Sequence, residues 1–310
     1  MKNNRRVNLR KIIANINLSQ ASLILKKHYK YNPGKPGRPP ISPTGLFLSF
    51  ILMFLRTESY RDYHAFLEKN QFWRRTLDFK QTPDIGNFTH FLQRIGTDTF
   101  EKLFQVVVQQ LLDEGFLNLH IIAQDGSILE GNQDDKQAGW GWDHIQERFV
   151  YGYKIHVIVD TNTELPIALN VTKANVHDST QFKELYPKTK TYKTRFPTRW
   201  FTGDKAFDTM VIRKTLLKDE IQPIIKPSKT RIKPCFPRWF LEKYKERIAV
   251  ERFFSRLKEY LDLKKLGIHG KNTVLLYTYL ISIGMLLVGY INHLFGYSPR
   301  SIKTFLRKFT

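Results

Sequence analysis

Three acidic residues lie far apart in the chain, each where a folded element could present its carboxylate. Asp125 follows a short apolar run, residues 119–123, that is typical of a strand. Asp204 follows a second strand-like run, 199–203, and Glu251 lies in a helical stretch further on. If the two strands are neighbours in one sheet, their acids meet at one edge and the helix can bring the third. Carboxylates without His or Cys suit hard Mg²⁺ or Mn²⁺, and two such ions can support in-line phosphoryl transfer.

Each acid by itself has a simpler interpretation, because an Asp at the end of a strand is often a turn or cap residue. Asp178 precedes a helical stretch, 179–185, and is expected to cap it. His156 and His177 are interpreted as structural or as facing DNA. The same turn or cap role is expected for Asp134, Asp135, Asp160 and Asp208. A shared site is favoured for the first three acids because they occur together in a strongly basic chain.

The stretch around Glu251 has a helical pattern of its own. At about 100° per residue, Tyr244, Arg247, Glu251 and Lys258 fall within roughly 60° of one another on one helix. Another face of this helix is apolar and can be buried. The polar stripe could be a solvated face with ion pairs four residues apart, or a face that binds a ligand. Neighbouring Arg252 and Arg256 project elsewhere and are expected on the surface or against a DNA backbone.

The charge of the chain favours a polyanionic partner. Fifty Lys and Arg against 28 Asp and Glu leave a net charge of +22. Neutralising phosphates releases counterions and gives affinity for nucleic acid without reading its sequence. One cysteine, Cys235, excludes a disulfide framework and a multi-cysteine zinc site. We therefore expect a folded protein of a reducing compartment that binds nucleic acid.

Two apolar runs raise the question of a membrane. Residues 46–55 are too few to span a bilayer, whereas 274–296 are long enough and contain no Lys, Arg, Asp or Glu. The second run contains polar Ser282, Asn292 and His293, which favours a helix buried in a protein core. The first ten residues are polar and basic, so no secretory signal is expected. The prediction is a protein without a membrane partner, with a membrane span as the alternative.

The chain divides into three predicted parts. Residues 1–41 form a basic segment that ends in a Pro/Gly-rich linker, whose Lys35 and Arg38 could lie along DNA. Residues 42–115 have helical patterns, with Ser42 and Ser59 as helix caps. This helical part is interpreted as a domain that binds DNA ends or, alternatively, as a cap that only packs on the rest. Residues 116–310 would form the catalytic domain and its C-terminal helices.

The third part alternates strands and helices. Strand patterns occupy 119–123, 151–160, 165–171, 199–203 and 221–225, with helices at 179–185 and 209–218. Three successive strands, a helix, a strand, a helix and a strand predict an α/β fold: a mixed sheet flanked by helices, preceded by an all-helical domain.

At this point the chain resembles the DDE-type transposases of insertion sequences. One subgroup of that family carries the signature Y-x2-R-x3-E-x6-K, which Tyr244, Arg247, Glu251 and Lys258 match in type and spacing. The segments 125–127, 152–156, 174–179 and 203–208 also resemble blocks of the family. The resemblance covers roughly residues 35–295 and implies a ribonuclease-H-like catalytic core.

The resemblance also implies roles for individual residues. Asp125, Asp204 and Glu251 would be catalytic and would hold two Mg²⁺ or Mn²⁺ ions. Tyr244, Arg247 and Lys258 would contact DNA phosphates beside the scissile bond. Lys154 and Lys205 could also reach the DNA strand. Asp204 and Glu251 are 47 positions apart, which leaves no room for the large β-rich insertion that supports hairpin formation in some relatives.

The expected partners are the terminal inverted repeats of an element and target DNA, both double-stranded. Analogy with the family suggests at least a homodimer on paired ends, in the cytoplasm and associated with the nucleoid. Two other functions stay open: an inactive DNA-binding repressor derived from a transposase, and a nuclease of the same fold that hydrolyses without joining. Loss of an acid would indicate the repressor, and all three acids are present.

Overall fold

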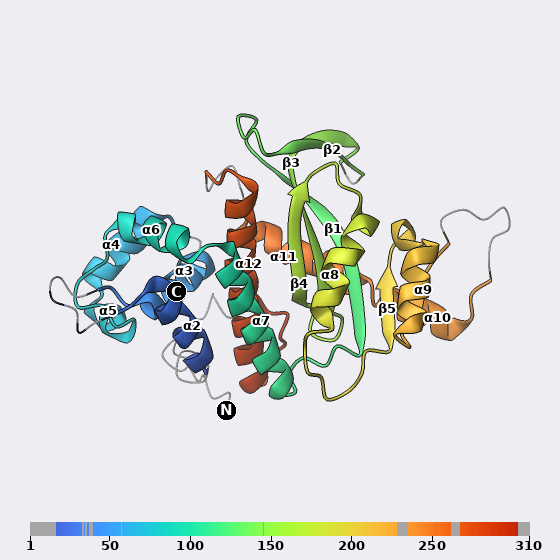
Figure 1. The fold of residues 1–310 in the computed structure, drawn as a ribbon, viewed down its shortest axis with the longest axis horizontal. Helices are drawn as coiled ribbons and strands as arrows, with labels where there is room; N and C mark the ends of the chain where they lie inside the picture. The colour runs from blue at the N-terminus through green and yellow to red at the C-terminus, as the bar shows by residue number, and fades with distance from the viewer. Residues whose placement is uncertain are drawn as a thin grey trace, which may run out of the picture. The chain divides into compact units, whose positions relative to one another are not determined.

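The computed structural model of the chain describes residues 17–302, apart from 33, 35, 37–39, 57, 145, 228–234 and 262–266. The described residues form two compact units, whose elements are labelled in Figure 1. One unit contains the described residues up to Val107 together with those from Thr278 onward, and the other runs from Val108 to Tyr277. Residues beyond 277 thus group with the amino-terminal helices. Which part binds DNA ends is a separate question, so the domains 1–41, 42–115 and 116–310 stay a prediction.

The first unit is helical throughout its described part, and two predicted helix starts are confirmed. The Ser42 hydroxyl accepts a hydrogen bond from the Gly45 N–H at 3.3 Å. The Ser59 hydroxyl accepts one from the Asp62 N–H, and the Asp62 carboxylate accepts from the Ser59 N–H, which completes a capping box. The helices are α2 (Ser19–Tyr29), α3 (Pro43–Leu55), α4 (Tyr60–Lys69), α5 (Gln71–Thr76), α6 (Ile85–Ile95), the start of α7 (Thr97–Asp113) and most of α12 (Lys271–Leu294).

Aromatic rings fill the core of this unit. Phe50 of α3 meets Phe88 of α6 edge-on, with 5.6 Å between ring centroids, and stacks on Phe91 at 5.9 Å. All three side chains are buried, and each contributes roughly 2 kcal/mol by leaving water. The apolar spacing of α3 and α6 in the sequence is therefore explained by one shared core.

Two parts of the amino-terminal region depart from the prediction or lie outside it. The helices α2 and α5 were not predicted, and their N-cap residues, Leu18 and Asn70, make no side-chain cap hydrogen bond. Of the predicted linker, 32–40, residues 33, 35 and 37–39 lie outside the described residues, and Lys35 and Arg38 are among them.

The apolar helix α12 is long and apolar enough to cross a membrane, with a mean hydropathy of 2.0 over its most apolar 18-residue window. However, 94% of that window is buried inside the protein. This burial agrees with the predicted core helix.

The second unit is built on a six-stranded mixed sheet. Its central order is β4-β3-β1-β5-β6, with β1 antiparallel to β3 and parallel to β5. The short strand β2 pairs with the first part of β3, and β4 pairs with the rest of it. The strands are β1 (Ile121–Glu130), β2 (Gly139–Asp143), β3 (Arg148–Asp160), β4 (Leu165–Lys173), β5 (Trp200–Gly203) and β6 (Gln222–Ile225).

Helices cover both faces of this sheet, with α8 in front and α11 behind it in Figure 1. The helical elements of the unit, besides parts of α7 and α12, are η1 (Asp178–Gln181), α8 (Phe182–Thr189), η2 (Lys205–Phe207), α9 (Met210–Lys218), α10 (Arg238–Lys245) and α11 (Ile248–Tyr260). The predicted α/β fold is confirmed: a mixed sheet flanked by helices and preceded by a helical region.

Three details of the prediction are wrong. The first strand does not stop at Ala123 but continues to Glu130, so Asp125 lies within β1 instead of after it. The strand β2 was not predicted. The helix expected through 244–258 is interrupted, because Glu246 and Arg247 form a turn between α10 and α11. Backbone hydrogen bonds there span three residues instead of four, as from the Arg247 N–H to the Tyr244 carbonyl.

Candidate active site

The register of two parallel strands brings Asp125 and Asp204 together. Ile121 of β1 lies opposite Trp200 of β5, and the ladder ends with Gln124 opposite Gly203. Asp125 directly follows Gln124, and Asp204 directly follows Gly203. The prediction that these strands are neighbours is confirmed, and the two acids follow the last paired residues at the same edge.

The Asp125 side chain is largely enclosed, with 19% of it exposed. Its Oδ1 accepts a hydrogen bond from the Gly126 N–H at 2.8 Å, and its Oδ2 accepts one from Arg247 at 3.3 Å. Burial raises the pKa of Asp125 to about 7, and the negative charges of Asp204 and Asp178 add to the rise. The hydrogen bond from Gly126 and the charge of Arg247 act in the opposite direction. The site thus concentrates more negative charge than one arginine neutralises.

Asp204 has a structural reason for its position. It precedes the single turn η2, and its Oδ1 accepts a hydrogen bond from the Ala206 N–H at 2.8 Å. This cap fixes the side chain just after β5. Within the described part of the chain, its other oxygen makes no hydrogen bond or ion pair.

Glu251 lies in the first turn of α11, with half of its side chain exposed, and Arg247 links it to Asp125. Arg247 donates from Nη2 to Glu251 Oε1 at 2.5 Å and from Nη1 to Asp125 Oδ2. The predicted proximity of Arg247 and Glu251 therefore survives the break in the helix. The guanidinium lies where a cation between the two carboxylates would lie.

The donor chemistry of this site fits a hard divalent cation, but the three acids are not gathered around one point. Among the described residues, no group of three or more His, Cys, Asp or Glu side chains is placed to hold a metal ion. The charge of Asp204 acts on Asp125, and Arg247 contacts both Asp125 and Glu251.

The other two predicted DNA contacts flank this arrangement. The Tyr244 ring is nearly parallel to that of Phe240, at 6.3 Å between centroids, and the Lys226 ammonium lies 4.4 Å from the Tyr244 ring centroid. Lys258 lies in the last turn of α11, near Asp143 of β2. Although the residue as a whole is exposed, burial lowers the pKa of its ammonium, and Asp143 acts in the other direction. The signature residues thus span two helices, with Tyr244 in α10 and Lys258 in the last turn of α11.

The expected surface position holds for Arg252, whose side chain is 49% exposed, but is wrong for Arg256, which is only 16% exposed. Both arginines pair with the same carboxylate. Arg252 donates to Glu164 Oε1 at 2.8 Å, and Arg256 donates to Oε2 at 2.7 Å. Glu164 closes the turn between β3 and β4, and its side chain is only 1% exposed. The two arginines anchor α11 to the end of the sheet. The sequence did not predict this pairing, because the helical period shows which face of the helix they occupy but not which residue lies opposite.

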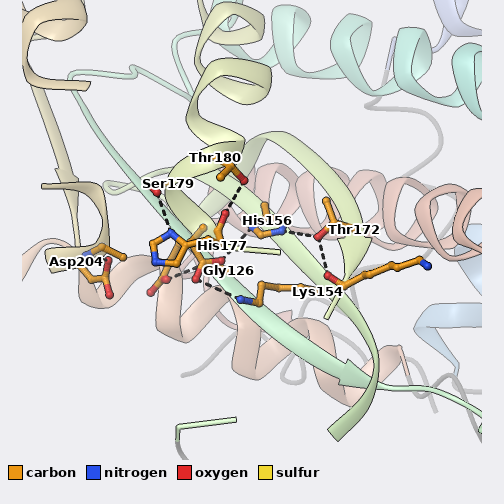
Figure 2. Close-up of polar contacts among 12 residues, drawn as sticks. Gly126, Lys154, His156, Thr172, His177, Ser179, Thr180 and Asp204 are labelled. Carbon is orange, nitrogen blue, oxygen red and sulfur yellow. Dashed lines mark hydrogen bonds and ion pairs between the residues drawn. The ribbon is translucent and has the colours of Figure 1, made fainter. Parts of the chain in front are cut away.

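The cap role expected for Asp178 is also wrong. Asp178 is the first residue of η1, and its carboxylate is turned toward β3, 3.1 Å from His156 Nδ1 and 3.5 Å from Lys154 Nζ. Figure 2 shows Lys154 and His156 beside Gly126, the residue that follows Asp125. Asp160 does have the predicted turn role, since it accepts hydrogen bonds from the Thr163 N–H and hydroxyl.

Comparison with known proteins decides the family. A family model described as Transposase DDE domain matches residues 119–287, more than half of the chain. The chain belongs to the Transposase DDE domain family. A second model, described as Transposase domain (DUF772), matches residues 2–94. The chain is therefore a DNA transposase, an enzyme of the polynucleotidyl-transferase type. No curated protein matches the transposase sequence.

Solved structures resemble the transposase only distantly. The catalytic core domain of BIV integrase matches at 13% identity and a TM-score of 0.32, over 53% of this chain and 82% of that one. The piggyBac transposase synaptic complex with hairpin DNA matches at 12% identity and a TM-score of 0.48, over 96% and 77%. The Mos1 mariner paired-end complex with Mn matches at 10% identity and 0.25, over 90% and 88%. Because every score is below 0.5, family membership rests on the sequence match.

Proposed function

We propose that this transposase cuts DNA at the ends of an insertion sequence and joins the freed strands to target DNA. Asp125, Asp204 and Glu251 would be its catalytic residues. The observation that supports this most directly is the β1–β5 register, which places Asp125 and Asp204 at adjacent positions on one sheet edge. Glu251 reaches the same edge through Arg247.

The same three carboxylates would hold Mg²⁺ or Mn²⁺, and we propose two ions. When bound, such ions stabilise charge on the attacking and leaving oxygens of an in-line displacement. The carboxylate of Asp125 is buried beside the negative charges of Asp204 and Asp178, which together raise its pKa, and a cation there would stabilise its ionised form. Glu251 becomes available to the site when Arg247 exchanges its carboxylate partners for a DNA phosphate.

Protein side chains would bind and orient the DNA. Arg247 offers a planar fork for two phosphate oxygens, whereas Lys258 offers a point charge further along α11. Tyr244 would line the same side of the strand. With the phosphate held, a water oxygen bonds to phosphorus as the P–O3′ bond breaks, which leaves a 3′-OH on the element. That hydroxyl then attacks a target phosphorus, and the target strand loses its own P–O3′ bond.

The substrate would be the terminal inverted repeats of the element, bound as a pair by at least a homodimer. We assign the chain to the Y-R-E-K signature subgroup, because Tyr244, Arg247, Glu251 and Lys258 match its spacing. The net charge of +22 supports binding to DNA. The proposed location is the cytoplasm, in association with the nucleoid.

The test is an assay with the full chain, labelled DNA carrying an element end, a supercoiled target and Mg²⁺. The wild-type protein is expected to give joined products. Glu251→Gln should bind the labelled end and fail to cut it, whereas Glu242→Gln, a matched change on exposed α10, should behave as wild type. Nicks without joined products would indicate the hydrolytic nuclease, and binding without nicks by the wild type would indicate the repressor.

A further inference from the structure

A buried polar cluster lies against Gly126, on the face of β1 opposite the Asp125 side chain, because neighbouring residues of a strand alternate between its faces. Figure 2 shows this cluster. His156 of β3 has a side chain only 1% exposed, and its Nε2 lies 2.8 Å from the Thr172 hydroxyl of β4. The Thr172 hydroxyl has one proton for two acceptors, His156 Nε2 and the Lys173 carbonyl 3.0 Å away, and only its donation to Nε2 leaves the ring proton on Nδ1 to face the Asp178 carboxylate. This bond fixes the ring and leaves Nδ1 facing Asp178, 3.1 Å away.

The carboxylate of Asp178 is held from two sides. His156 faces its Oδ1, and the Lys154 ammonium lies 3.5 Å from its Oδ2. Both partners are on β3 and are mostly buried, with Lys154 only 14% exposed. A carboxylate between a fixed ring and an ammonium has little freedom to rotate. Lys154, which was expected to reach DNA, is instead occupied with Asp178.

Gly126 makes this placement possible. A Cβ atom at Gly126 would lie 1.9 Å from Asp178 Oδ1, so no other residue type leaves room for the carboxylate. Gly126 also donates its N–H to Asp125. Asp178 therefore lies directly against the peptide that orients Asp125.

The turn that begins at Asp178 touches the second acid-bearing segment as well. Its residues contact η2, the turn that Asp204 caps. The turn is braced internally, because His177 Nδ1 lies 2.8 Å from the Ser179 hydroxyl and the Thr180 hydroxyl donates to the His177 carbonyl at 2.7 Å. One rigid turn is thus the common neighbour of the segments that carry Asp125 and Asp204.

We propose that Asp178 is a positioning residue of the cleavage site, which fastens this turn to β1 and so fixes Asp125 and Asp204 at the separation that a shared divalent cation needs. The inference rests on the proposed function. Asp178 itself lies against Gly126, on the face of β1 away from the Asp125 carboxylate, and is not a catalytic residue. Loss of a residue that orients a metal-binding side chain typically lowers metal affinity or activity by about 10–100-fold.

The experiment uses Asp178→Asn in the full chain, because Asn keeps the shape and loses the charge that pairs with Lys154. Binding of Mn²⁺ is measured by electron paramagnetic resonance without DNA, and cleavage of an element end is measured separately. We expect Mn²⁺ affinity and kcat to fall by about 10–100-fold, with the KM for DNA unchanged. A merely structural weakening would lower both only in proportion to the unfolded fraction, which a melting curve reports.

Two further variants complete the design. Asp219→Asn is the matched control, because Asp219 also pairs with a lysine, Lys190 at 2.8 Å. Asp219 lies at the end of α9, so this variant should leave Mn²⁺ affinity and kcat unchanged. Gly126→Ala keeps every charge while it displaces Asp178, and should reproduce the loss.

The outcomes separate this inference from the proposed function. A folded Asp178→Asn protein with wild-type Mn²⁺ affinity and kcat overturns the positioning role alone. If that variant does not fold, Lys154→Met decides: weaker Mn²⁺ binding supports the role, and unchanged binding overturns it. A wild-type chain that binds Mn²⁺ and never cuts DNA counts against the proposed function instead.

Discussion

Arg247 Nη1 lies 3.3 Å from Asp125 Oδ2, although the two residues are 122 positions apart in the chain. The other end of the same guanidinium donates to Glu251. One protein cation therefore offsets part of the repulsion between carboxylates that would otherwise face each other. Its position between them means that Arg247 and a divalent ion compete for the same acids.

This competition gives the first prediction. Arg247→Ala should bind Mn²⁺ without DNA roughly tenfold more tightly, since a unit charge a few ångströms away is worth at least 1 kcal/mol at the effective dielectric of a protein surface. Cleavage should nevertheless fall by about 100-fold or more, because the phosphate loses a bidentate partner. Electron paramagnetic resonance and an end-cleavage assay measure the two effects.

The control for Arg247 is Arg238→Ala, which removes another arginine paired with a glutamate four residues on. Arg238 is 93% exposed and its ion pair is with Glu242, which is not one of the three acids, so both readouts should stay at the wild-type level. Weaker Mn²⁺ binding by Arg247→Ala would show that the guanidinium organises the acids instead of competing for them.

The second prediction concerns the anchor of α11. Glu164→Ala leaves Arg256, which is only 16% exposed, without the carboxylate that it contacts at 2.7 Å. Removal of one partner from a buried ion pair is strongly destabilising. We expect the free energy of unfolding to fall by about 2–4 kcal/mol, somewhat less than for a fully buried pair, because Arg252 is half exposed. Urea unfolding measures the loss. Glu242→Ala, which breaks an exposed pair, should cost less than about 0.5 kcal/mol, and equal losses in the two variants would contradict the anchor.

The sequence predicted most of this fold because its local signals agree with the tertiary structure. Ser42 and Ser59 cap the helices that the apolar patterns after them predict. The apolar runs before Asp125 and Asp204 form neighbouring strands. When the predicted order of strands and helices is correct, the positions of the acids that follow those strands are also determined. Asp160 in its turn follows the same logic.

The departures come from contacts that no local pattern contains. An Asp before a helical stretch reads as a cap, and nothing near Asp178 indicates that its carboxylate is turned toward His156. The break before α11 has no Gly or Pro at Glu246 or Arg247 to mark it. The partner of Arg252 and Arg256 is a single buried glutamate about 90 positions earlier, which only the folded sheet brings to α11. Side-chain pairs across the fold were therefore the least predictable features.

The third prediction is a pH dependence of stability that Asp160 causes. Its side chain is fully buried, and burial raises its pKa from 3.8 to about 6, against the effect of the hydrogen bonds from Thr163. Between pH 4 and 6 the folded protein then binds more protons than the unfolded chain at this position, so this group's contribution to stability falls as pH rises. In Asp160→Asn that fall should disappear, as urea unfolding at a series of pH values would show.

Asp135 provides the opposite sign as a control. Burial raises the pKa of Asp135, but hydrogen bonds from the Gly270 N–H, the Tyr153 hydroxyl and the Gln137 N–H outweigh it and leave the pKa lowered. Its contribution is present above pH 4 and is lost as pH falls below that value. Asp135→Asn should therefore remove an acid-side loss of stability. Profiles that change in the same direction in both variants would contradict the assignment.

The last prediction tests whether DNA follows α11 from Glu251 toward Lys258. Because Lys258 lies in the last turn of that helix, a phosphate held there would be separated from the acids by about two turns, roughly 10 Å. Lys258→Ala should weaken binding of an element end and lower the slope of log affinity against log salt by about 0.9, the value of one phosphate contact. Fluorescence anisotropy over a range of salt concentrations measures the slope. Lys190→Ala, which removes a lysine paired with Asp219, should leave the slope unchanged; equal slopes for wild type and Lys258→Ala would exclude this path for the DNA.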